Sequence, residues 1–215
     1  MQLGFFVFCV VYAFVLAIRL LLKEFDDNAF VHYLRPWVLA VPQALLLLFV
    51  WKILKCRGET WEDIGVRSAS TSLGYLAGFL CVPVNLIFSA ICVYLTLEYG
   101  PEFAAIPNIP KDILGNGWFI VINLLTITVW VPAVEEIFFR GFMMRTMARK
   151  MSVPLAILGS SLVFSLAHGH VGLLVPIFIS SVVLSTLYIK TNSLYPPILA
   201  HSIQNLVASV VAASS

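Results

Sequence analysis

The most unusual residues of this sequence are three charged side chains in one apolar stretch. Residues 131–144 read VPAVEEIFFRGFMM, with Glu135, Glu136 and Arg140 among hydrophobic neighbours. On a helix, Glu136 and Arg140 are four residues apart and can pair along one face, whereas Glu135 points about 100° away from Glu136. An ion pair that fixes helix packing explains Glu136 and Arg140 but leaves Glu135 without a structural reason. Glu135 is therefore a candidate for catalysis.

Two later apolar stretches add the other polar groups that a hydrolase needs. FSLAH places Phe164 and His168 one helical turn apart, and HSIQN places His201 and Asn205 four residues apart on one face. Taken alone, each group also suits a structural role, such as hydrogen bonds between membrane helices, which contribute about 0.6 kcal/mol on average. Together with Glu135, they supply a base for water and donors for the oxyanion of a tetrahedral intermediate. No serine or cysteine is convincingly paired with a histidine, so a covalent nucleophile is not indicated.

The composition indicates that membrane-spanning helices position these groups. The chain of 215 residues is 60% hydrophobic and 11% charged, against about 45–50% and about 25% in soluble domains. So little charge cannot cover a soluble surface, and backbone amides inside a bilayer favour helices. Ionisable residues within such helices usually mark function. We therefore expect an all-α polytopic membrane protein with its charged cluster in the bundle interior.

Seven apolar segments approach the length of about 20 residues that a membrane span requires. They are approximately Leu3–Leu22, Trp37–Leu54, Leu73–Leu97, Trp118–Met144, Val153–Ala167, Val171–Ile189 and Leu194–Ala213. We predict a single membrane domain over 1–215, a transmembrane bundle of about seven helices. The fifth segment is short, which suits a tilted, half-buried or partly re-entrant helix.

The loops predict the orientation of the bundle and exclude one class of partner. If seven helices cross in turn, the loops on one side hold Lys52, Lys55, Arg57, Arg67, Arg145, Arg149, Lys150 and Lys190, and the opposite loops hold only Lys23, Arg35 and Lys111. The positive-inside rule then predicts a cytoplasmic N-terminus. A net charge of +2 argues against a basic surface for nucleic acid, and the four cysteines lack metal-ligand spacing.

The three motifs, in this order on successive apolar segments, resemble those of a known family. EEIFFR matches E-E-x-x-x-R, FSLAH matches F-x-x-x-H and HSIQN matches H-x-x-x-N. The ordered set resembles the CAAX prenyl protease and bacteriocin-processing (ABI, CPBP) family of intramembrane glutamic endopeptidases. The similarity divides the chain into generic N-terminal spans and loops at 1–116 and a catalytic core at 117–210.

The resemblance implies a role for each motif residue. Glu135 and His168 would hold and activate the hydrolytic water, and His201 and Asn205 would form the oxyanion hole. The supporting residues would be Glu136, Arg140 and Phe164. The family is regarded as metal-independent, so we expect no metal and no cofactor. The expected partners are membrane lipids and a membrane-associated peptide or lipidated protein, including prenylated CAAX-type substrates, in a prokaryotic inner membrane.

Three other functions use the same residues. Glu135, His168 and His201 could form the ligand set of a catalytic zinc ion, although the sequence has no H-E-x-x-H. A non-catalytic membrane protein, such as a bacteriocin-immunity factor, could bind a peptide without cutting it. A transporter could relay protons through paired carboxylates, although the sequence has no internal repeat. Chelation tests the first alternative, and a phenotype that survives Glu135→Ala would indicate the second.

Overall fold

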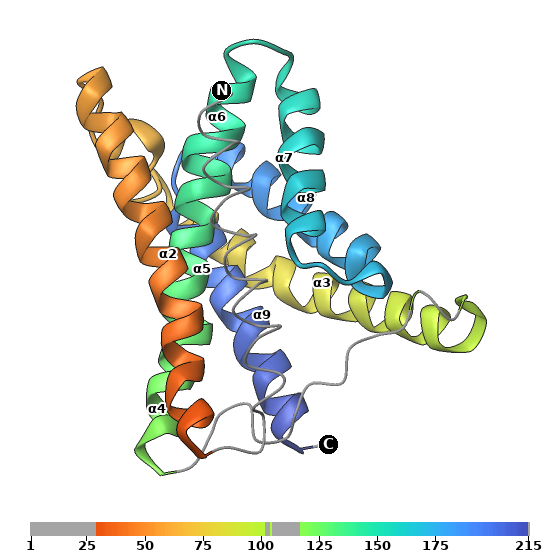
Figure 1. The fold of residues 1–215 in the computed structure, drawn as a ribbon. Helices are drawn as coiled ribbons and strands as arrows, with labels where there is room; N and C mark the ends of the chain where they lie inside the picture. Colours follow the sequence, from red (N-terminus) through yellow and green to blue (C-terminus); the bar gives the residue numbers. More distant parts are fainter. Residues whose placement is uncertain (1–28, 102–103, 105–116, 215) are drawn as a thin grey trace.

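Helices make up all the regular structure in the part of the chain that the structure describes. The computed structural model describes residues 29–101, 104 and 117–214, and the fold in these ranges is all-α, as the composition predicts (Figure 1). The main separate helices are α2 (Ala29–Arg57), α3 (Ser72–Tyr99), α7 (Val153–Ala167), α8 (Leu174–Thr191) and α9 (Tyr195–Ser214).

One long helix carries the glutamate pair. It runs continuously over Trp118–Ala148 and contains α4 (Trp118–Leu125), α5 (Val131–Glu136) and α6 (Arg145–Ala148). Two π-helical segments, Thr126–Trp130 and Ile137–Met144, separate these parts. Segments of π-helix inside α-helices occur frequently at functional sites, and here they flank α5 on both sides.

Within the described residues, four helices are long and apolar enough to cross a membrane. They are Ser72–Tyr99, Trp118–Ala148, Val171–Thr191 and Tyr195–Ser214, and Val153–Ala167 is apolar but shorter. Six of the seven predicted spans coincide with helices, although α2 is not among these four. The predicted first span, Leu3–Leu22, lies outside the described residues. The described residues therefore contain four candidate membrane spans, and a total of about seven stays a prediction.

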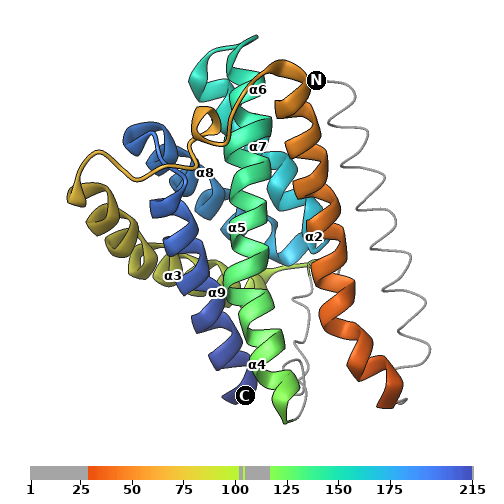
Figure 2. The ribbon, with the colours of Figure 1, turned by 90° about the vertical axis from the view of Figure 1, so that its left-hand side faces the viewer.

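The helices are arranged around α5. In both ribbon views, α2 lies along one side of the long helix and α9 along the other, and both contact α5 (Figures 1 and 2). Helix α7 packs against α8, whereas α3 extends at a wide angle and contacts α8 and α9. Large apolar side chains of α3, including Phe79, Val84 and Ile87, are exposed. Such a surface suits lipid better than water.

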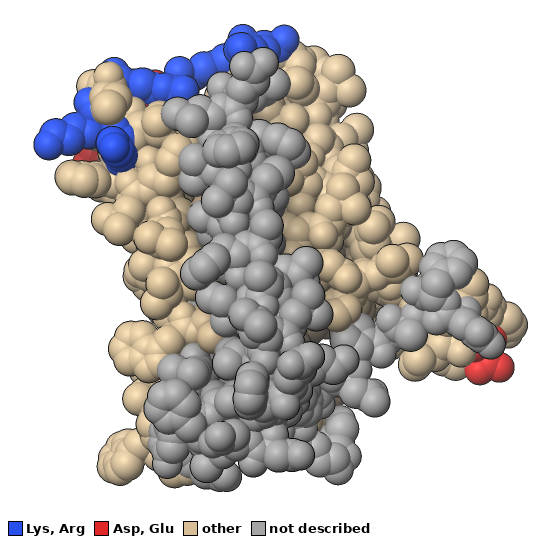
Figure 3. Space-filling model, in the orientation of Figure 1, with Lys and Arg blue, Asp and Glu red and all other residues tan. Residues whose placement is uncertain are grey.

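Basic side chains gather at one end of the molecule. Figure 3 shows the Lys and Arg residues of that view at the end where α2 finishes and α6 lies. There Glu59, in the loop after α2, pairs with Arg145 and Arg149. In the same loop, hydrogen bonds from Thr60 hold the pKa of Asp63 below its usual value. This basic end agrees with the charge pattern of the loops, and its assignment to the cytoplasm stays a prediction.

A close approach of α3 to α9 gives a first prediction. A Cβ atom at Gly78 would lie 2.9 Å from the carbonyl oxygen of Pro196, so Gly78→Ala should force the two helices apart. We expect a loss of about 1–3 kcal/mol of stability, seen as a lower midpoint of thermal unfolding in detergent. Ala77→Val, at the exposed neighbouring position, is the control. Equal midpoints for the two variants would contradict this packing.

Candidate active site

A buried ion pair forms the centre of the site. Arg140 Nη1 donates to Glu136 Oε1 at 2.8 Å, and both side chains are 0% exposed. Arg140 also donates to the hydroxyls of Ser181 at 2.9 Å and Ser185 at 3.3 Å, and its guanidinium lies 4.6 Å from the centre of the Phe164 ring. A buried pair is favourable only when further contacts satisfy its charges. These contacts compensate the buried charge of Arg140.

The two serines were missed by the sequence analysis. Ser181 and Ser185 are four residues apart on α8, so both lie on one face of an otherwise apolar helix. That spacing is a signal that could have identified them as the partners of a buried charge.

Glu135 faces away from the ion pair, as its helical position predicts. Its side chain is buried at 6% exposure, and its Oε1 accepts a hydrogen bond from Gln43 Nε2 at 3.2 Å. Its Oε2 lies 3.9 Å from His201 Nε2. The two carboxylate oxygens therefore face side chains of two different helices, α2 and α9.

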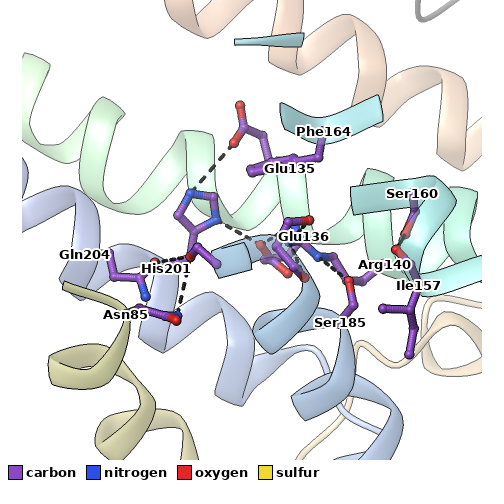
Figure 4. A network of polar contacts seen from close by, with 12 residues as sticks. Asn85, Glu135, Glu136, Arg140, Ile157, Ser160, Phe164, Ser185, His201 and Gln204 are labelled. Carbon is purple, nitrogen blue, oxygen red and sulfur yellow. Dashed lines mark hydrogen bonds and ion pairs between the residues drawn. The ribbon is translucent and has the colours of Figure 1, made fainter. Parts of the chain in front are cut away.

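His201 lies between the two glutamates (Figure 4). Its Nδ1 is 2.9 Å from Glu136 Oε1, the same oxygen that accepts from Arg140. Because an oxygen paired with arginine acts as an acceptor, His201 Nδ1 is the donor. This bond fixes the ring so that Nε2 is the atom that faces Glu135.

Phe164 connects the second motif to the third. Its ring centre lies 4.7 Å from that of His168 and 5.9 Å from that of His201. The backbone carbonyl of Phe164 is 2.8 Å from His168 Nδ1. A carbonyl only accepts hydrogen bonds, so Nδ1 carries a proton, and in the neutral ring Nε2 then holds the lone pair. The Phe164 carbonyl thus favours the neutral tautomer of His168 in which Nε2 is a hydrogen-bond acceptor.

The amide of Asn205 compensates for a break in the long helix. The N–H of Val131 donates to the carbonyl of Thr126 in the π-helical segment, and Pro132 has no N–H. The carbonyl of Ile127 thereby lacks both of its usual helical donors, and Asn205 Nδ2 donates to it at 3.0 Å. This contact joins α9 to the long helix and fixes the orientation of the amide.

The residues of the three motifs thus lie on converging helices, α5 with the π-helical segment after it, α7 and α9. Glu135, Glu136, Arg140, Phe164 and His201 are linked by the contacts given above, His168 adjoins Phe164, and Asn205 is on α9 one turn beyond His201. Their catalytic roles stay predictions.

A second polar cluster lies beside the site. Asn85 Nδ2 donates to Ser180 Oγ at 3.4 Å, and Ser180 Oγ donates to Gln204 Oε1 at 3.1 Å. These bonds join α3, α8 and α9 (Figure 4). They support the interpretation of Asn85 as a helix-packing residue.

The metal-ligand alternative has a specific geometric requirement. Zinc in a catalytic site needs three protein ligands at about 2.0–2.2 Å from the ion. Within the described ranges, no three or more His, Cys, Asp or Glu side chains form a group that could hold a metal ion.

A family model matches the part of the chain that carries the three motifs. The family is described as type II CAAX prenyl endopeptidase Rce1-like, and it matches residues 117–207. Comparison with curated proteins and with solved structures found no match. The matched region contains α4 to α8 and part of α9, whereas α2 and α3 lie outside it.

Proposed function

We propose that this protein is an intramembrane glutamic endopeptidase, because residues 117–207 match the family model described as type II CAAX prenyl endopeptidase Rce1-like. The observation that carries the proposal is that the two glutamates have different partners. Glu136 is bound by Arg140 and His201, whereas Glu135 is buried, has no arginine partner among the described residues, and faces His201 Nε2. A carboxylate in this position is suited to accept a proton.

The first step that we propose is activation of water by Glu135 and His168. Glu135 takes a proton from the water as the water oxygen attacks the carbonyl carbon of the scissile peptide bond. His168 Nε2 accepts a hydrogen bond from the same water, in the tautomer that the Phe164 carbonyl favours. General-base catalysis of this kind contributes about 100- to 10,000-fold to a rate.

The oxyanion that forms on the carbonyl oxygen would be stabilised by His201 and Asn205. Asn205 has two amide hydrogens, and the bond to Ile127 uses one of them, so the other can donate to the oxyanion. His201 can donate from Nε2 when its ring carries both protons, with Nδ1–H held by Glu136. Loss of one such donor typically costs about 100- to 1,000-fold in kcat.

Collapse of the tetrahedral intermediate completes the reaction. The bond between the carbonyl carbon and the peptide nitrogen breaks, and Glu135 returns its proton to the departing nitrogen. The products are a peptide with a new carboxyl group and a peptide with a new amine. No covalent enzyme intermediate forms, and Glu135 ends the cycle as a carboxylate.

The proposed substrate is a peptide or lipidated protein held at the membrane, of the prenylated CAAX class. The proposed location is a prokaryotic inner membrane with the basic end on the cytoplasmic side. The family name supports the substrate class, and the membrane-spanning helices support access from the bilayer.

Cleavage of a defined peptide tests the proposal. Purified protein in detergent micelles is expected to cut a fluorescence-quenched peptide that ends in a farnesylated CAAX-type sequence, and mass spectrometry should locate the cut bond. The unfarnesylated peptide is the control for the lipid. Cleavage should persist after treatment with 1,10-phenanthroline. Loss of cleavage that added zinc restores would instead support a zinc hydrolase, and binding without cleavage would support a non-catalytic peptide-binding protein.

A further inference from the structure

We propose that Gln43, on α2, is a positioning residue that holds the carboxylate of Glu135 in its reactive orientation. The inference rests on the proposed function, because it assigns Gln43 a task in the same reaction. Gln43 lies outside the matched region 117–207, in a part of the chain that the sequence describes only as a generic span.

The position of Gln43 on its helix is the first observation. Gln43, Leu46, Val50 and Leu54 are all buried, and their spacing places them on one face of α2. The three leucine and valine side chains belong to the apolar core that also contains Val134 and Phe138 of the long helix. Gln43 lies on the same face of α2 but is polar, and its side chain contacts Glu135.

The hydrogen bonds of the Gln43 amide are the second observation. Its Nε2 donates to Glu135 Oε1 at 3.2 Å, whereas its Oε1 is buried without a hydrogen-bond partner among the described residues. A buried amide atom without a partner carries a desolvation cost. The described contacts therefore give this amide one interaction that offsets its burial, and that interaction is with the proposed catalytic base.

The effect of Gln43 on Glu135 follows from the different contacts of the two carboxylate oxygens of Glu135. The Gln43 amide occupies Oε1, and Oε2 is the oxygen that lies 3.9 Å from His201 Nε2. A donor on one oxygen restrains rotation of the carboxylate and leaves the other oxygen to take the proton. Small errors in the placement of a catalytic group have large kinetic costs, since a displacement of about 1 Å can lower a rate about 100-fold.

Three variants test the inference on the wild-type background. Gln43→Met keeps the length and volume of the side chain but removes the donor, and we expect kcat for the farnesylated CAAX-type peptide to fall about 10- to 100-fold, with KM within about twofold. Gln43→His, whose Nε2–H reaches about as far as the amide, should recover part of kcat. Gln204→Met is the matched control, because Gln204 is also an interior amide that has one atom without a partner among the described residues but bonds to Ser180. This variant should leave kcat near the wild-type value.

The pattern of these results separates positioning from packing. Wild-type kcat in Gln43→Met, an equal fall in Gln204→Met, or no recovery in Gln43→His would each overturn the inference. A rise in KM with unchanged kcat would overturn it as well, because it would place Gln43 in substrate binding.

A thermal double-mutant cycle tests the Gln43–Glu135 contact without any peptide. Gln43→Met, Glu135→Met and the double variant are compared by their unfolding midpoints in detergent, and residues in direct contact should give a shift that is not the sum of the single shifts. An additive result would overturn the inference. If the wild-type protein cut no peptide while the cycle was non-additive, the proposed function would fail although the contact exists, so the two failures are distinguishable.

Discussion

Glu135→Gln is expected to lower kcat/KM about 100- to 10,000-fold while the protein stays folded. The amide keeps the shape of the carboxylate and can still accept the hydrogen bond from Gln43, but it cannot take a proton from water. The measurement is the rate of cleavage of the farnesylated CAAX-type peptide, together with the midpoint of thermal unfolding. The midpoint should lie close to that of the wild-type protein.

The control is the same chemical change at an exposed glutamate. Glu98 lies near the end of α3 and is exposed, so Glu98→Gln should leave both the rate and the unfolding midpoint unchanged. Near-full turnover in Glu135→Gln would show that Glu135 is not the base. A cellular phenotype that survives this change would favour binding over cleavage.

Arg140→Met is expected to destabilise the protein by about 3–5 kcal/mol, because it leaves Glu136 as a buried charge without its cation. Glu136 is 0% exposed, and its Oε2 already has no hydrogen-bond partner among the described residues. Methionine fills much of the volume of arginine, so the loss reports on charge more than on packing. The measurement is the free energy of unfolding in mixed detergent micelles.

Arg149→Met is the matched control for this prediction. Arg149 pairs with Glu59 at the exposed basic end of the molecule, where ion pairs contribute about 0–1 kcal/mol. Adding Glu136→Gln to Arg140→Met should recover part of the stability, because it removes the unpaired charge. Equal losses in Arg140→Met and Arg149→Met would contradict the importance of the buried pair.

Short-range spacing predicted much of the site. The four-residue separation of Glu136 and Arg140 predicts their ion pair, which the structure has at 2.8 Å. The same helical geometry predicts that Glu135 faces elsewhere, and its contact with Gln43 agrees. These predictions succeed because residues within one helix are fixed relative to one another by the helix itself.

Contacts between distant segments could not be predicted in this way. Gln43 and Glu135 are 92 positions apart, and their contact depends on the rotation of α2 about its own axis. The bond from Asn205 to the Ile127 carbonyl depends on a π-helical register that appears only when the backbone is known. Pro132 predicts a disturbance in the helix, but it does not identify the side chain that compensates for it.

The order of the helices along the chain has a consequence for biosynthesis. A ribosome releases the helices in chain order, so the long helix enters the membrane before α9. Glu136 and Arg140 can neutralise each other at that stage, since they lie on one helix. His201 and Asn205 arrive with α9, after every other described helix. The proposed proteolytic centre is therefore incomplete during insertion, and the docking of α9 would complete it.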